Sequence, residues 1–140
     1  MRAVGIDYGK ARIGLALSDP SRIVATPLSV LSVDKSDALK TTAEKLIKSL
    51  DSYAKEIDLL VLGHPLELSG KAGPMAEEVE AFFSHLEKAS PWPIQLWDER
   101  LTTAQVDRGF KEAGLSRKAR AKLADSASAA LMLQSFLDVS

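Results

Sequence analysis

Short apolar runs open the chain, at the length and spacing of β-strands. Residues 2–8 and 12–18 are joined by the stretch YGKA, which predicts a hairpin whose Gly9 supplies the special backbone angle of the turn. Residues 22–31 are a third strand candidate, and Pro27 within them indicates an edge strand or a bulge, because proline cannot donate to a ladder. This part of the chain therefore predicts three antiparallel strands.

The spacing then changes to the helical period. Apolar residues recur on one face and predict an amphipathic helix from Ser36 to about Glu56: Leu39, Ala43, Leu46, Ile47, Leu50 and Tyr53. The unbroken apolar run at 57–63 ends in glycine and predicts a buried central strand. Pro74 suits the first position of a helix that runs to about Ala89.

The last third of the chain holds one more strand and two helices. WPIQLWDE (92–99) is the fifth strand candidate, and Thr102 with Gln105 forms a capping-box pattern that starts a helix directly after it. GLSRKAR breaks that helix, and the final one covers 120–137. With no repeat and no long linker, we expect a single domain over residues 1–140. The fold class is α/β, with a five-stranded mixed sheet (three antiparallel strands, then parallel strands) flanked by helices.

Composition narrows the classes of function. The 140 residues are 46% hydrophobic and 26% charged, which is typical of a globular protein, and the absence of cysteine excludes disulfides and thiolate metal sites. We find no secretory leader and no apolar run of membrane-spanning length, so we expect a cytoplasmic protein without a membrane partner. The formal net charge of −1 argues against a protein that coats nucleic acid. The local basic stretch SRKARAK (116–122) instead suits an enzyme that contacts nucleic acid briefly.

Four acidic residues stand out from those on solvated helix faces. Asp7 closes an apolar strand, Asp98 and Glu99 close another, and Asp125 lies in a helix whose other residues are mostly small or apolar. Each has an ordinary explanation: a turn-forming Asp, a strand-end salt bridge or helix N-terminal pair, and an ion pair with Lys122. Taken together they predict a site, because parallel strands of open α/β sheets bring their carboxyl ends to one edge.

Carboxylates without cysteine or a histidine cluster favour a hard cation. The predicted site therefore suits Mg²⁺ or Mn²⁺, and two such ions can activate water and stabilise the leaving oxygen of a phosphodiester. Lys10, Arg12 and Arg100 are candidates for holding the substrate phosphates, against the alternatives of a solvated turn lysine and an Arg100 salt bridge. His64 follows the fourth strand and is a candidate for proton transfer, or a loop histidine without such a role.

Four motifs in order, GIDYGKARIGLALSD, VLGHPLELSGKAGP, DERLTT and ADSASAALMLQSFL, resemble the YqgF/RuvX family of pre-16S rRNA nucleases or Holliday-junction resolvases. The resemblance covers nearly the whole chain. It implies an RNase H-like fold and a divalent-metal nuclease that acts on precursor rRNA or branched DNA. It also implies maturation of the 5′ end of 16S rRNA in ribosome biogenesis, with ribosomal particles as possible partners.

The family's acidic positions fall on Asp7, on the DER motif and on Asp125. Strand alternation lets only one of Asp98 and Glu99 face the metals, and we favour Glu99. The chain departs from the family at His64, where the pattern usually reads Gly-Leu-Pro.

Two other classes of function are alternatives to a nuclease. GIDYGKARIG also looks like the first phosphate loop of actin-like kinases, but those proteins duplicate the fold, and this chain has one copy and no second phosphate loop, so its length decides against this class. The second alternative is a non-catalytic factor of the ribosome or the transcription machinery that keeps the fold. The sequence leaves the oligomeric state undecided, although a resolvase that cuts two strands symmetrically should be a dimer.

Overall fold

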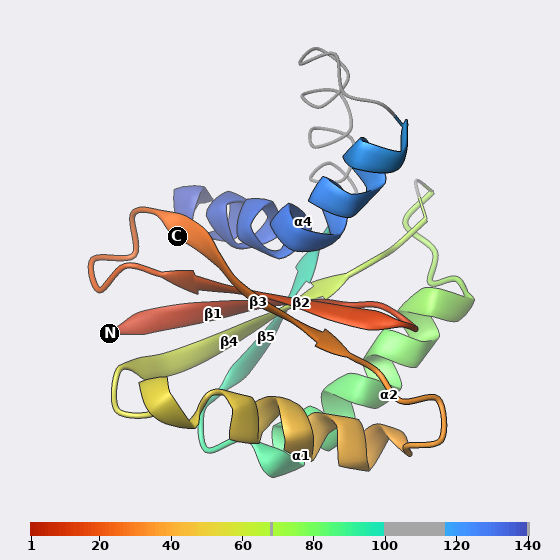
Figure 1. The fold of residues 1–140 in the computed structure, drawn as a ribbon, viewed down its shortest axis with the longest axis horizontal. Helices are drawn as coiled ribbons and strands as arrows, with labels where there is room; N and C mark the ends of the chain where they lie inside the picture. The colour runs from red at the N-terminus through yellow and green to blue at the C-terminus, as the bar shows by residue number, and fades with distance from the viewer. Residues whose placement is uncertain (68, 100–116, 140) are drawn as a thin grey trace.

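A computed structural model describes residues 1–67, 69–99 and 117–139, with residues 117–126 described by their backbone alone. Five strands form one sheet in the order β3-β2-β1-β4-β5 (Figure 1). The elements in chain order are β1 (Arg2–Tyr8), β2 (Arg12–Ser18), β3 (Ala25–Ser32), α1 (Leu39–Ser49), the 3₁₀ turn η1 (Asp51–Tyr53), β4 (Ile57–His64), α2 (Pro74–Ala89), β5 (Ile94–Asp98) and α4 (Arg117–Val139).

The sheet is mixed, and β1 is its central strand. β1 and β2 pair antiparallel, as do β2 and β3, whereas β4 runs parallel to β1 and β5 runs parallel to β4. The predicted α/β class and mixed sheet are therefore confirmed. Because three neighbouring strands run the same way, their carboxyl ends lie at one edge of the sheet, which is where open α/β sheets carry their sites.

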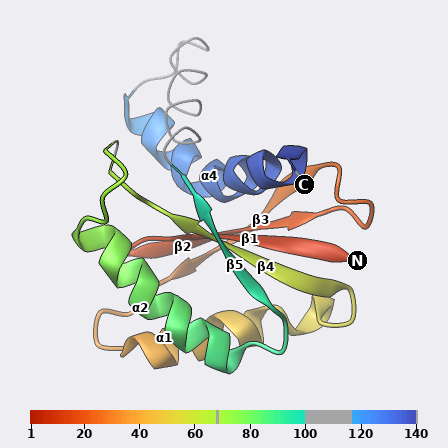
Figure 2. The ribbon, with the colours of Figure 1, turned by 180° about the vertical axis from the view of Figure 1, so that it is seen from behind.

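Helices cover both faces of the sheet. Figures 1 and 2 show α4 on one face and α1 with α2 on the other. Alternation along β1 divides its side chains between the two layers: Val4, Ile6 and Tyr8 pack with α1 and α2, and Ala3 packs with α4. Of the helices that the structure describes, none combines the length and apolar character needed to cross a bilayer.

Several predicted boundaries move by a few residues, and local hydrogen bonds explain two of the shifts. β3 begins at Ala25 rather than at residue 22, because Asp19 accepts the backbone N–H groups of Ile23 and Val24 and so closes the turn there. α1 begins three residues later than predicted, after a turn in which the Asp34 side chain accepts from the N–H and hydroxyl of Ser36.

Three other predicted elements differ from the structure in their bounds. The predicted helix to Glu56 divides into α1 and η1, the fifth strand is shorter than 92–99, and the final helix is longer than 120–137. α2 has the predicted bounds. The helix predicted from Thr102 lies outside the described residues.

Two details of the β1–β2–β3 unit test the predicted roles of glycine and proline. The prediction for Gly9 is wrong in its reason, because Gly70 is the glycine with positive φ in the described part of the chain. A Cβ at Gly9 would instead lie 2.6 Å from the carbonyl oxygen of Arg12, so the close approach of the two strands excludes a side chain. The prediction for Pro27 is confirmed, since β3 is an edge strand and the register shifts between Leu15 and Ala16 beside it.

Candidate active site

Two acidic side chains meet at the carboxyl edge of the central strands. Asp7 is the penultimate residue of β1, and Glu99 directly follows β5. Glu99 is only 9% exposed, and its carboxyl group is hydrogen-bonded to that of Asp7. The backbone N–H of Glu99 donates to the carbonyl oxygen of His64 at 3.2 Å, which holds the end of β5 against the end of β4. We call Asp7 and Glu99 the carboxylate pair.

The burial of the carboxylate pair affects the ionisation of Glu99. Burial raises the pKa of Glu99 to about 9, and the negative charge of Asp7, its hydrogen bond and the charge of Asp98 add to the effect. Glu99 is therefore protonated at neutral pH and donates to Asp7. Two carboxyl groups pressed together in this way repel each other when both ionise, and a bound cation would relieve that repulsion.

A glycine makes room for Glu99. Gly63 on β4 lies between β1 and β5 in the sheet, in register with Trp97. A Cβ on Gly63 would lie 2.4 Å from the carboxyl carbon of Glu99 and 2.5 Å from its Oε1, so no other residue fits there without moving Glu99. The sequence analysis used Gly63 only as the end of a strand, although a glycine closing a buried apolar run is also a signal of close approach.

The final helix adds a hydroxyl to the carboxylate pair. Ser128 of α4 donates a hydrogen bond to Asp7 Oδ2. α4 can lie this close to β1 because Gly5 faces it: a Cβ on Gly5 would lie 2.8 Å from Leu133 Cβ and 3.0 Å from the carbonyl oxygen of Ala129. Sequence reasoning missed Ser128, and the signal available was its place in a run of small residues that also holds Asp125.

Two of the predicted acidic residues differ from the carboxylate pair in their placement. Asp98 is exposed, whereas its neighbour Glu99 is buried against Asp7, as strand alternation requires of adjacent residues. Asp125 lies in α4 three residues before Ser128, and its side chain is outside the described part of the structure. Among the described side chains, no three His, Cys, Asp or Glu residues converge as a metal-binding group.

The two basic candidates among the described residues, Lys10 and Arg12, lie between the end of β1 and the start of β2. Lys10 is exposed and lines a cavity of about 280 Å³ with Tyr8 and Glu78, on the α1/α2 side. In that cavity, burial and the nearby Glu78 carboxylate raise the pKa of Tyr8 to about 12. Arg12 is exposed at the start of β2. Arg100 lies outside the described residues.

His64 contacts an acidic residue of α2. Its Nε2 lies 3.4 Å from Glu80 Oε2. Since Gly63 faces Glu99, alternation turns the next side chain, His64, to the opposite face of the sheet. The structure therefore brings the backbone of His64 to Glu99, and its imidazole to α2.

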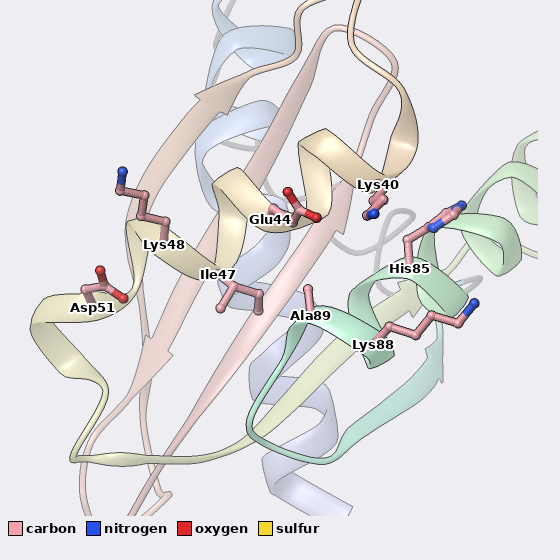
Figure 3. Close-up of a pocket in the computed structure, with 8 residues that line it drawn as sticks. All are labelled: Lys40, Glu44, Ile47, Lys48, Asp51, His85, Lys88 and Ala89. Atoms are coloured by element: carbon pink, nitrogen blue, oxygen red, sulfur yellow. The ribbon is translucent and has the colours of Figure 1, made fainter.

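A larger cavity lies between α1 and α2, on the other face of the sheet from the Ser128–Asp7 contact. A groove of about 520 Å³ runs between α1 and α2, and Figure 3 shows its lining side chains. It has a partly apolar floor at Ile47 and Ala89, and a rim of both signs: Lys40, Glu44, Lys48, Asp51, His85 and Lys88. Because α1 and α2 cover the face opposite α4, the groove and the Ser128–Asp7 contact lie on different sides of the sheet.

Comparison with known proteins identifies the family to which the chain belongs. A family model described as "RuvX: Holliday junction resolvase" matches residues 1–139. The chain belongs to the RuvX family. This confirms the resemblance drawn from the four sequence motifs.

Relatives and solved structures agree with that assignment. Proteins of Protochlamydia amoebophila and Rhodobacter capsulatus, each named "Putative pre-16S rRNA nuclease", are 43% and 42% identical to this RuvX protein. The alignments cover 98% and 96% of this chain, and 93% and 81% of those relatives. A Thermus thermophilus RuvC structure matches with a TM-score of 0.56 at 15% identity, covering 99% of this chain and 97% of that one. The fowlpox virus Holliday junction resolvase matches with a TM-score of 0.55 at 12% identity over both full chains. The two structures show a shared RuvC-like RNase H fold.

Proposed function

We propose that this RuvX protein is a divalent-cation-dependent nuclease that hydrolyses phosphodiester bonds of precursor 16S rRNA, at its 5′ end. The observation that carries the proposal is the carboxylate pair, held together by a hydrogen bond at the carboxyl edge of β1 and β5. The names of relatives more than 40% identical over nearly the whole chain support the choice of RNA substrate. Assembling ribosomal particles are the setting in which such a precursor would be met.

The donor set of the site fits Mg²⁺ or Mn²⁺. Asp7 and Glu99 offer hard oxygen ligands, and Gly63 leaves their side of β4 free of a blocking side chain. Glu99 is protonated at neutral pH only because it is buried beside another carboxylate, so a cation between the two would displace that proton. The charge supplied by one or two such ions would activate water and stabilise the leaving oxygen of the phosphodiester.

The chain's own residues would have distinct roles around that centre. Asp7 and Glu99 would hold the cations, and Asp125 of α4, the helix that also carries Ser128, is the proposed third ligand. Lys10, Arg12 and Arg100 would bind phosphate oxygens of the strand being cut. A protein of net charge −1 needs such local cations, because its overall field does not attract nucleic acid.

Asp7→Asn tests the proposal, because it removes the charge of the central ligand and keeps its shape. We expect purified wild-type protein with Mg²⁺ or Mn²⁺ to shorten a 5′-extended 16S rRNA precursor, and Asp7→Asn to reduce the rate at least 100-fold. Asp51→Asn, at an exposed carboxylate of the α1/α2 groove, is the matched control and should cut like wild type. Equal cleavage by wild type and Asp7→Asn would show that the activity comes from a contaminant. It would favour the alternative of a non-catalytic partner of the ribosome or the transcription machinery that keeps the fold.

Cleavage of branched DNA is the second candidate function. The description of the family model favours it, since it names a Holliday junction resolvase. A resolvase makes two symmetrical cuts and is expected to act as a dimer. We therefore propose offering a four-way DNA junction in the same assay, with the oligomeric state measured by light scattering. Paired nicks by a dimeric protein, without cleavage of the rRNA precursor, would favour the resolvase.

A further inference from the structure

Ser128 makes a bond that is unusual for a serine within a helix. Such serines commonly return their hydroxyl to a carbonyl of the preceding turn, as Ser49 does to Leu46 and Ser84 does to Glu80. The Ser128 hydroxyl instead donates to Asp7 Oδ2, across 121 residues of sequence. The hydroxyl of Ser128 therefore serves the central strand.

The position of Ser128 is fixed by the packing on its C-terminal side. Ala129 and Leu133 lie against Gly5, where even a methyl group would meet their atoms at 2.8–3.0 Å. Gly5 and Asp7 lie on the same face of β1, since side chains two residues apart in a strand point the same way. The close contact at Gly5 thus holds the Ser128 hydroxyl over Asp7.

We propose that Ser128 is a positioning residue that holds the Asp7 carboxylate in one orientation and thereby raises the affinity of the site for a divalent cation. The hydroxyl of Ser128 engages Oδ2 of Asp7, and the same carboxylate is hydrogen-bonded to Glu99. A carboxylate ordered in advance loses less conformational freedom when it takes up a metal. Hydrogen-bond partners that orient a metal ligand typically contribute about 10–100-fold in metal affinity.

The inference rests on the proposed cation site, and Ser128→Ala tests it. Alanine is a better helix former than serine, so the variant should keep α4 intact. We expect Mn²⁺ titrated by calorimetry to bind Ser128→Ala about 10-fold or more weakly than wild type. In the cleavage assay, the Mn²⁺ concentration for half-maximal rate should rise by a similar factor, with the KM for the RNA unchanged.

Two further variants separate positioning from a general effect on the helix. Ser128→Thr keeps the hydroxyl and should restore most of the affinity. Ser135→Ala, two turns along α4, removes a hydroxyl that accepts from Trp97 Nε1 at 3.3 Å, and should bind Mn²⁺ like wild type. Unfolding temperatures of the metal-free proteins show whether any variant has lost its fold.

The outcomes distinguish this inference from the proposed function. If Ser128→Ala binds Mn²⁺ as tightly as wild type, or if Ser135→Ala loses as much affinity, the positioning role is refuted and the nuclease proposal stands. If wild type itself takes up no Mn²⁺, or binds no better than Asp7→Asn, the proposed cation site fails first.

Discussion

The two faces of the sheet differ in the size of the side chains that the strands bury there. On the α1/α2 face the strands bury large residues such as Ile6, Leu15 and Leu62 against Phe82 and Leu86. On the α4 face the buried strand residues are small, with Ala3, Ala16 and Val61, and they pack against α4 residues that include Ala129, Met132 and Leu133. Large side chains keep layers apart and bury much apolar area, whereas small ones let a helix approach the backbone of the strands.

The small strand residues and the candidate chemistry lie on the same face, that of α4. The carboxylate pair and the Ser128 hydroxyl lie on the α4 side, where Gly5 and Gly63 leave room for close contacts. The large apolar strand side chains lie on the other side, where the rings of Tyr8 and Phe82 contact each other at a centroid distance of 4.7 Å. Substitutions on the α1/α2 face should therefore affect unfolding, and those on the α4 face should affect cation binding.

The largest expected effect on stability comes from Phe82→Ala. Phe82 is fully buried, so its truncation removes apolar contacts and leaves a cavity that costs about 3–5 kcal/mol. Urea unfolding at constant pH measures this loss. The folded variant should keep the wild-type affinity for Mn²⁺ within a factor of two, and a much larger change would mean that the two faces are coupled.

A second prediction concerns pH and lies on the α4 face. Unfolded Glu99 ionises near its ordinary pKa of 4.5, while folded Glu99 keeps its proton up to a pKa of about 9. The folded state thus binds the extra proton across that window, so the free energy of unfolding falls as pH rises through it. For metal-free protein we expect the loss from pH 5 to pH 8 to be on the order of a few kcal/mol.

Glu99→Gln is the control for that pH dependence, because its amide does not titrate. Urea unfolding in EDTA at pH 5 and pH 8 should show a smaller loss for Glu99→Gln than for wild type. Parallel losses would mean that Glu99 is ionised in the folded protein at pH 8.

The smallest expected effect is that of Glu80→Gln on α2. The side chain of Glu80 is 46% exposed, and its contact with His64 is long, so removing the charge should change stability by less than about 1 kcal/mol. The affinity for Mn²⁺ should not change. A tenfold change in that affinity would place His64 and Glu80 in the active site and would weaken the division between the two faces.

The periodicity of the sequence predicted the sheet and the layers well, because apolar spacing follows burial directly. The strand at 57–63 and the helix from Pro74 have nearly the predicted bounds. The predictions erred at turns, where side chains such as Asp19 and Asp34 close hydrogen bonds that periodicity does not register. Gly9 shows a similar limit. A glycine that is needed because a side chain has no room looks the same in the sequence as a glycine that is needed for a positive φ.

The candidate site was predicted in part. Asp7 and Glu99 are predicted because each closes an apolar strand at the edge where open α/β sheets carry their sites, and the structure brings these two together. Ser128 was missed because a serine in a helix has no comparable signal in the sequence. Its partner is 121 residues away, and only the packing of α4 on β1 brings the two together.

The docking of α4 also determines when the site can exist during folding. Asp7 leaves the ribosome early in synthesis, whereas Glu99 and Ser128 follow much later. Gln134 of α4 also binds the β2–β3 turn, accepting from the N–H of Ala25 and donating to the carbonyl of Ile23 over 109 and 111 residues. Contacts of such long sequence separation form late, since the loop between them must close first. A nascent chain therefore carries Asp7 without its partners, and the complete site appears only when the last helix has docked.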